Sequence, residues 1–143
     1  MAGILEMEFE VDGEDYRHAG EASSKVKAAL KEIGMPSAFT KRVAIAMYEG
    51  EINMVIHGNG GVATIEIDEE VVKVTLKDKG KGIPDVEKAM QEGYSTASDG
   101  AKQMGFGAGM GLPNMKKHSD EMKIDTKVGE GTTVFLTFYV NQR

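Results

Sequence analysis

The sequence predicts an α/β fold, with helices covering one face of a mixed, mainly antiparallel sheet, in a single domain over residues 1–143. A chain of 143 residues, 41% of them hydrophobic, is long and apolar enough to bury one core. Two segments in the first half show the apolar spacing of helices. Strand-like runs flank them and also end the chain, which predicts a sheet and helix layer.

Two adjacent helices are predicted first. Glu21 to Ile33 carries apolar residues at helical spacing, and Gly34 followed by Pro36 ends that helix. Ser37 can cap a second helix, whose part from Val43 to Ile56 is dense in Ala, Ile, Val and Met. We therefore expect the second helix to be buried on most sides.

Five strands are predicted around these helices. Ile4 to Val11 alternates apolar and acidic residues, which is typical of a half-buried strand at a sheet edge or an interface. Val62–Ile67 and Val71–Leu76, joined by an acidic turn, predict an antiparallel hairpin. Met122–Thr126 and Thr132–Tyr139 predict two more strands around a glycine turn.

The segment before the last two strands is rich in glycine. A short helix is expected over Asp85–Glu92, and residues 93–111, which hold six glycines, predict a mobile lid. Leu112–His118 predicts a helix with Pro113 in its first turn, where the missing amide proton costs nothing.

Composition excludes several functions. A net charge of −6 argues against nonspecific binding to nucleic acid or to an anionic membrane, so a protein or a small molecule is the expected partner. The absence of cysteine excludes disulfides, thiolate metal sites and a thiol nucleophile, and it fits a reducing cytoplasm. The acidic N-terminal residues predict neither a signal peptide nor a membrane span.

A polar stripe interrupts the apolar second helix. Glu49, Asn53 and His57 are four residues apart and share one helix face. An amide oxygen can bind Mg²⁺, and a carboxylate one turn away can take a proton from a hydroxyl. The alternatives are a satisfied core network or a solvent-facing edge, and His57 is more simply a packing or capping residue. Gly50 weakens the helix, so its presence there needs an explanation, such as close approach of backbone or ligand.

Two glycine-containing motifs follow. The first motif, Asp78-Lys79-Gly80-Lys81-Gly82, lies at the end of a predicted strand. A carboxylate there can accept a hydrogen bond from the amine of adenine, and glycines let a flat base approach the backbone. The alternative is an ordinary turn. The second motif, residues 105–112 (GFGAGMGL), leads directly into a predicted helix. Its backbone amides and the positive end of the helix dipole can therefore bind phosphates. The alternative is a flexible lid without a ligand, which has a similar glycine content. No Gly-Lys-Ser/Thr of a Walker loop is present there. The turn at residues 129–133 is unremarkable alone.

Together, the four motifs resemble a known superfamily. Glu49-x-x-x-Asn53, Asp78-x-Gly80-x-Gly82, Gly107-x-Gly109-x-Gly111 and Gly131-Thr132 occur in the order and spacing of the Bergerat-fold ATPases. That superfamily unites gyrase, MutL, histidine kinases and heat-shock chaperones. Within it, residues 48–53 (YEGEIN) and 82–85 (GIPD) resemble the anti-sigma regulatory serine/threonine kinases. Residues 92–96 and 111–113 are closer to the switch kinases of stress signalling complexes than to direct sigma binders.

The resemblance implies a Bergerat-type two-layer sandwich that binds ATP and Mg²⁺. It implies that Glu49 is the catalytic base, that Asn53 is the metal ligand, and that Asp78 contacts adenine. The ATP-binding residues that it implies are Asn53, Asp78, Gly80, Gly82, Ile83, Gly107, Gly109, Met110, Gly111, Leu112 and Thr132.

The implied function is a cytoplasmic serine/threonine protein kinase of bacterial partner switching. Such a kinase transfers the γ-phosphate of ATP to a serine of an antagonist protein; a sigma-factor partner and a homodimer are left open. No direct contact with nucleic acid or membrane is expected. The alternatives are a non-catalytic ATP-sensing switch that binds a partner and a plain ATPase. A histidine-kinase catalytic domain fits poorly, because no helix pair carries a phosphoacceptor histidine.

Overall fold

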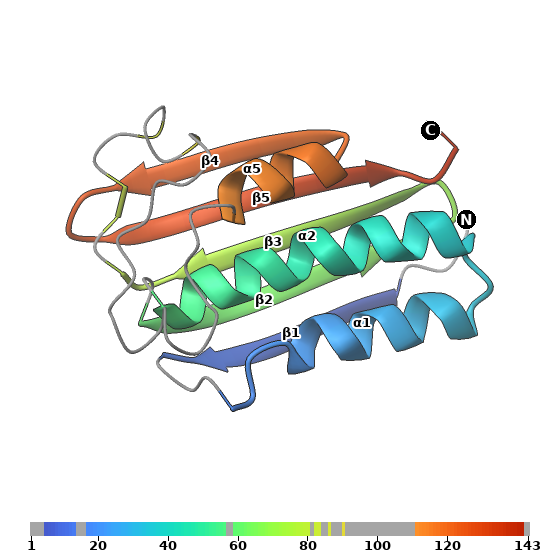
Figure 1. The fold of residues 1–143 in the computed structure, drawn as a ribbon, viewed down its shortest axis with the longest axis horizontal. Coiled ribbons are helices and arrows are strands. Elements are labelled where there is room, and N and C mark those ends of the chain that lie inside the picture. Colours follow the sequence, from blue (N-terminus) through green and yellow to red (C-terminus); the bar gives the residue numbers. More distant parts are fainter. Residues whose placement is uncertain are drawn as a thin grey trace.

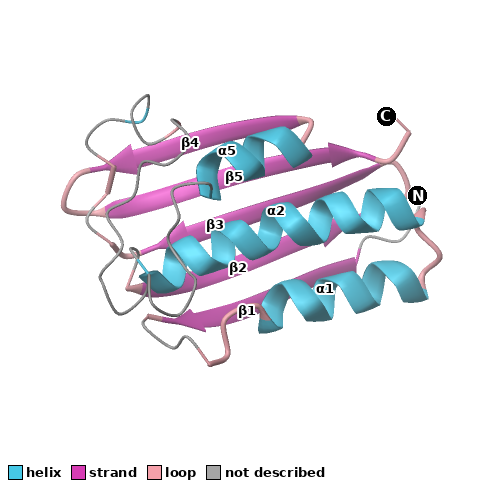
Figure 2. Cartoon of the chain, viewed as in Figure 1, coloured by secondary structure: helices cyan, strands magenta, loops and turns pink. Residues whose placement is uncertain are grey.

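The computed structural model describes residues 5–13, 17–56, 59–80, 82–83, 86, 90 and 111–141. These residues form one layer of helices on one face of a sheet, as Figures 1 and 2 show. The elements are β1 (Leu5–Asp12), α1 (Glu21–Glu32), α2 (Ser37–Ile56), β2 (Gly60–Ile67), β3 (Val71–Asp78), α5 (Gly111–His118), β4 (Glu121–Lys127) and β5 (Gly131–Tyr139). The predicted α/β fold with helices on one face is confirmed.

The five strands form one sheet in the order β1-β2-β3-β5-β4. All four pairings between these described strands are antiparallel, so the parallel pair implied by a mixed sheet is absent from the described part. The predicted hairpin is present, and at its turn the Asp68 carboxylate accepts from the amides of Glu70 and Val71. These two hydrogen bonds lower the pKa of Asp68. The predicted edge position of β1 is confirmed.

The core lies between α2 and the sheet. Alternate residues of β2, β3 and β5 point to the helices and are buried: Ala63, Ile65, Ile67, Val72, Val74, Leu76, Val134, Leu136 and Phe138. Helix α2 is buried on most sides, as predicted, because it contacts α1, α5 and the sheet. A Cβ added at Gly50 would overlap Leu76 Cδ1 and lie 3.0 Å from Met115 Cε. The glycine in mid-helix is therefore explained by close packing.

Element boundaries differ from the prediction by a few residues. Helix α2 begins at Ser37, the residue predicted to cap it, and β3 extends to Asp78 instead of ending at Leu76. Helix α5 begins at Gly111, so Pro113 lies in its first turn as predicted. The predicted helix over 85–92 and the lid over 93–111 lie almost wholly outside the described residues. Within that helix, Met90 donates its amide to the carbonyl of Val86 at 3.0 Å, as in a helical turn.

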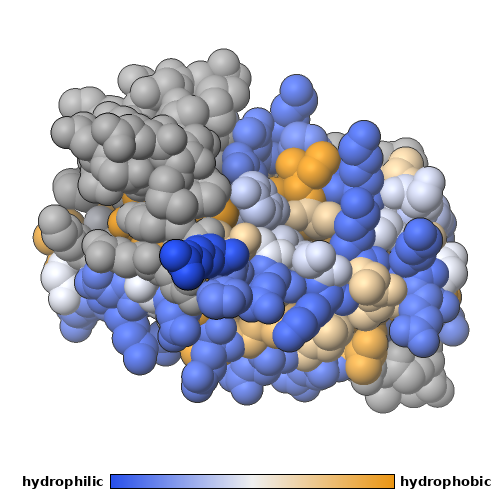
Figure 3. Space-filling view, turned by 60° about the horizontal axis from the view of Figure 1, so that its bottom comes forward, coloured by the Kyte–Doolittle hydropathy of each residue, from blue (hydrophilic) through white to orange (hydrophobic). Residues whose placement is uncertain are grey.

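Helix α1 and strand β1 border one side of the molecule. Figure 3 looks toward this side, where hydrophilic surface is broken by small apolar areas. Among the described helices, none is both long and apolar enough to cross a membrane.

Candidate functional site

The polar stripe of α2 faces the N-terminal half of α5. Asn114 of α5 donates its side-chain amide to Glu49 Oε2 at 3.0 Å. One turn further along α2, the amide group of Asn53 lies against Gly111, the first residue of α5. A Cβ added at Gly111 would lie 2.8 Å from both Oδ1 and Nδ2 of Asn53. The stripe thus places a carboxylate and an amide beside the start of one helix.

Helix α5 is held against α2 at both ends. At its C-terminal end, Arg42 Nη1 donates to the carbonyl of His118 at 3.2 Å and lies 3.6 Å from the carboxylate of Asp120. At its N-terminal end, Gly111 contacts Asn53, and Asn53 Nδ2 is 3.9 Å from Met115 Sδ. The free amides of the first turn of α5 are consequently fixed relative to Asn53, and the positive end of the helix dipole lies there.

The environment of Glu49 includes other ionisable groups on α2. Tyr48 precedes it and is exposed, and partial burial raises the pKa of the Tyr48 phenol, helped by the charges of Glu49 and Glu51. Glu49 itself is half-buried. Within the described part of the chain, Asn114 is the hydrogen-bond partner of the Glu49 carboxylate. That carboxylate is thus oriented by one donor and accessible to another.

Asp78 ends β3 and organises a second polar group. Its Oδ1 accepts from the amide of Gly80 at 2.9 Å and from the amide of Thr132 at 3.0 Å. Gly131 packs on the backbone of Asp78 so closely that a Cβ there would overlap the Asp78 carbonyl. Asp78 therefore stabilises the turn through its Oδ1 atom. Neither of these two hydrogen bonds uses Oδ2.

Gly82 and Ile83 complete this second group. Gly82 has a φ of +79°, and a Cβ there would lie 2.5 Å from the carbonyl oxygen of Lys127. The Ile83 amide donates to Thr126 Oγ1 at 2.8 Å, and Thr126 Oγ1 is 2.8 Å from Thr132 Oγ1. The threonine pair therefore ties residues 82–83 to the β4–β5 turn and, through the Thr132 amide, to Asp78.

Both groups lie at the same end of the molecule. Figure 1 shows that α2 and β3 end, α5 begins, and β4 turns into β5 at this end. Leu112 is buried in the core, at 8% exposure, so it anchors the start of α5 from below. Gly107, Gly109 and Met110 of the predicted phosphate loop lie outside the described residues, as do Lys81 and His57.

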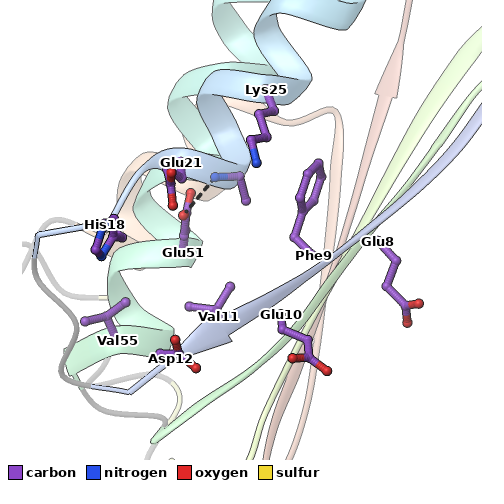
Figure 4. A pocket seen from close by; sticks show the side chains of 11 residues that line it. Glu8, Phe9, Glu10, Val11, Asp12, His18, Glu21, Lys25, Glu51 and Val55 are labelled. Atoms are coloured by element: carbon purple, nitrogen blue, oxygen red, sulfur yellow. Dashed lines mark hydrogen bonds between the residues drawn. The ribbon is translucent and has the colours of Figure 1, made fainter.

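Sequence reasoning missed three polar residues. Asn114 and Thr126 make their contacts across elements, with partners 65 and 43 residues away in sequence, so no local pattern reveals them. Glu51 is only 2% exposed, and its carboxylate accepts from the amides of Gly20, Ala22 and Ser23 at 3.0 to 3.1 Å. Figure 4 shows Glu51 pointing into the first turn of α1. A charged residue at position 51 of an apolar helix could have indicated a buried contact, because buried charges are normally paired.

The fold and these two groups define a class of protein. A helix bearing Glu and Asn faces the start of a second helix, and a strand-end carboxylate lies at the same end of a five-stranded antiparallel sheet. This is an ATP-binding domain of the two-layer kind. Residues 14–138 match the model of the histidine kinase-like ATPase domain. The chain belongs to the histidine kinase-like ATPase domain family.

Two curated relatives show which members of this family the chain is similar to. The chain is 32% identical over 108 residues to the serine/threonine-protein kinase RsbT of Bacillus subtilis, covering 73% of this chain and 75% of that one. It is 35% identical over 98 residues to the anti-sigma F factor of Geobacillus kaustophilus, covering 64% of each chain. The resemblance drawn from the motifs is thereby confirmed.

A solved structure supports the fold alone. The RsbU and RsbW domains of a Mycobacterium tuberculosis protein match with a TM-score of 0.65 at 18% identity. The match covers 94% of this chain and 32% of that one.

Proposed function

We propose that this chain is a serine/threonine protein kinase that transfers the γ-phosphate of ATP to a serine of an antagonist protein. The observation that carries the proposal is the pairing of Glu49 with Asn114 beside the contact of Asn53 with Gly111. A base at Glu49 and a metal ligand at Asn53 would lie next to the start of α5, and the start of a helix is suited to binding phosphates. Relatives named as a serine/threonine kinase and as an anti-sigma factor support it.

Asn53 is the proposed ligand of Mg²⁺. Its amide lies against the start of α5, so a cation bound by Oδ1 would sit beside the phosphates held by that helix. Within the described residues, no group of three His, Asp or Glu side chains could form a metal cage. That fits Mg²⁺, which takes one or two protein oxygens together with phosphate oxygens and water. The ion would neutralise charge on the β- and γ-phosphates.

Phosphate binding is proposed for the amides at the start of α5. Gly111 and Leu112 belong to its first turn, and the proposal adds Gly107, Gly109 and Met110 from the preceding segment. Adenine recognition is proposed for Asp78 Oδ2, which would accept from the exocyclic amine. Gly80, Gly82, Ile83 and Thr132 would line the base, since they already surround Asp78 or join its hydrogen-bond network.

Glu49 is the proposed catalytic base. The serine oxygen of the antagonist would attack the γ-phosphorus while the bond to the bridging oxygen of ADP breaks. The Glu49 carboxylate would take the serine proton, and Asn114 would hold that carboxylate in place.

The proposed setting is a bacterial partner-switching pathway in the cytoplasm. A sigma factor and a second copy of the chain remain predicted partners. A non-catalytic ATP-sensing switch is the second candidate, because one relative is named as an anti-sigma factor and not as a kinase.

Transfer of labelled phosphate separates these functions. Extract of the source cell is incubated with γ-labelled ATP, Mg²⁺ and either the chain or its Glu49→Gln variant. The proposal expects a labelled phosphoserine protein with the wild-type chain and none with the variant, although both bind ATP in calorimetry. ATP binding without phosphoserine would favour the switch, and release of inorganic phosphate from the purified chain alone would favour a plain ATPase.

A further inference from the structure

Strand β1 leaves one side of its backbone without a partner in the described part of the chain. It spans eight residues, Leu5–Asp12, and pairs only with β2 on its inner side. In an antiparallel strand about half of the N–H and C=O groups point to each side. The outer edge of β1 therefore offers a row of hydrogen-bonding groups to another strand.

A cleft of about 560 Å³ lies along this edge, between β1 and the start of α1. Figure 4 shows Phe9 and Val11 pointing toward α1, with Lys25 extending from α1 into the same space. Phe9 is half-buried and Val11 is buried, and both pack on the core. Phe9 and Val11 thus give the cleft a short apolar strip beside the free edge, within a lining that is mostly polar.

The other face of β1 is acidic. Glu6, Glu8, Glu10 and Asp12 alternate with the apolar residues and are all exposed. Glu8 and Glu10 point away from the cleft floor in Figure 4. Lys25 is the one lysine or arginine among the described residues that line the cleft. A strand added here would therefore meet the side chains of Phe9 and Val11 on one face and a row of carboxylates on the other.

This pattern excludes a second copy of β1 as the added strand. Two copies of β1 would pair about a twofold axis perpendicular to the sheet, which keeps each face on its own side. In the two registers with the greatest overlap, each copy places three or four of its acidic residues opposite those of the other; in one of them Glu6 faces Asp12 and Glu8 faces Glu10. Like charges directly opposite one another are destabilising.

We propose that the free edge of β1 binds an extended segment of a partner protein in which apolar and basic residues alternate. The segment adds a sixth strand to the sheet. Its apolar side chains enter the cleft against Phe9 and Val11, and its lysines or arginines lie opposite Glu8 and Glu10. This docking surface is independent of the nucleotide site.

A labelled peptide tests the proposal on the full chain without nucleotide. The probe is an eight-residue peptide of alternating valine and lysine, and the control peptide carries glutamate for lysine. Fluorescence anisotropy should show binding of the lysine peptide, weakening as salt is added, and at least about tenfold weaker binding of the glutamate peptide. Amide hydrogen exchange should show new protection in β1.

Two charge reversals complete the test. Glu10→Lys should weaken the lysine peptide about fivefold or more. Asp125→Lys makes the same change on the exposed face of β4, at the opposite edge of the sheet, and should alter binding less than about twofold. Equal losses in the two variants, equal binding of the two peptides, or protection outside β1 would overturn the proposal.

Discussion

The two oxygens of the Asp78 carboxylate have different surroundings. Oδ1 holds the turn by accepting two backbone amides, and Oδ2 is the atom that we propose contacts adenine. The two interpretations that the sequence leaves open, a turn residue and an adenine contact, therefore belong to different atoms of one side chain. A substitution can separate them.

Asp78→Asn should keep the fold and lose the base preference. An asparagine Oδ1 still accepts from Gly80 and Thr132, whereas its NH₂ group faces the base and can donate to the carbonyl of guanine. We expect ATP and ADP to bind about tenfold more weakly, with the preference for ATP over GTP reduced by a similar factor. Calorimetry with the three nucleotides measures this; weaker binding with an unaltered preference would leave Asp78 as a turn residue alone.

If Glu49 is the base, Asn114 is a positioning residue, because it contacts the Glu49 carboxylate. Asn114→Ala removes the amide donor from Glu49 Oε2, and kcat should fall about tenfold while the affinity for Mg-ATP changes less than about twofold. Lys116→Ala is the matched control, because Lys116 is exposed on the same helix. Phosphotransfer kinetics measure kcat, and calorimetry measures the affinity for Mg-ATP. A loss of affinity equal to the loss of kcat would mean that Asn114 only supports the fold.

Contacts between helices fix the elements around the site. Glu51 ties the start of α1 to α2 by accepting three amides of a helix that has no side-chain cap of its own. Arg42 ties the end of α5 to α2. These anchors lie on opposite sides of α2, so that helix carries both the polar stripe and its supports.

Glu51→Gln should destabilise the chain by about 2 kcal/mol. The amide keeps one acceptor oxygen but turns an NH₂ group toward backbone donors, which leaves buried N–H groups unpaired. Urea unfolding followed by circular dichroism measures the change. Glu32→Gln, an exposed position in the last turn of α1, should cost less than about 0.5 kcal/mol. Equal stability of the two variants would contradict the role of Glu51.

Over the whole molecule, local patterns predicted the elements, and only the structure gives their arrangement. Alternation in β1 and the apolar run of α2 are properties of neighbouring residues, so a single sequence reveals them. The pairing of β3 with β5 joins Val71 to Tyr139, and nothing local encodes a contact of that separation. It sets the strand order and brings Thr132 to Asp78.

The same distinction applies to the candidate site. Spacing places Glu49 and Asn53 on one helix face and Asp78 at a strand end, and the resemblance to the Bergerat-fold family then implies their roles. Asn114 and Thr126 could not, since their importance depends on how α5 packs on α2 and how β4 meets residues 82–83.

We propose that Mg-ATP binds where α2 meets the start of α5, and Asn53→Ala tests this site most directly. Within the stripe, Glu49 is the one other oxygen donor, and it is engaged with Asn114, so no described side chain there replaces the lost ligand. Calorimetry should show a loss of at least about 100-fold in affinity for Mg-ATP, with the free energy of unfolding changed by less than about 1 kcal/mol. An affinity equal to that of the wild-type chain would place the metal and the phosphates elsewhere.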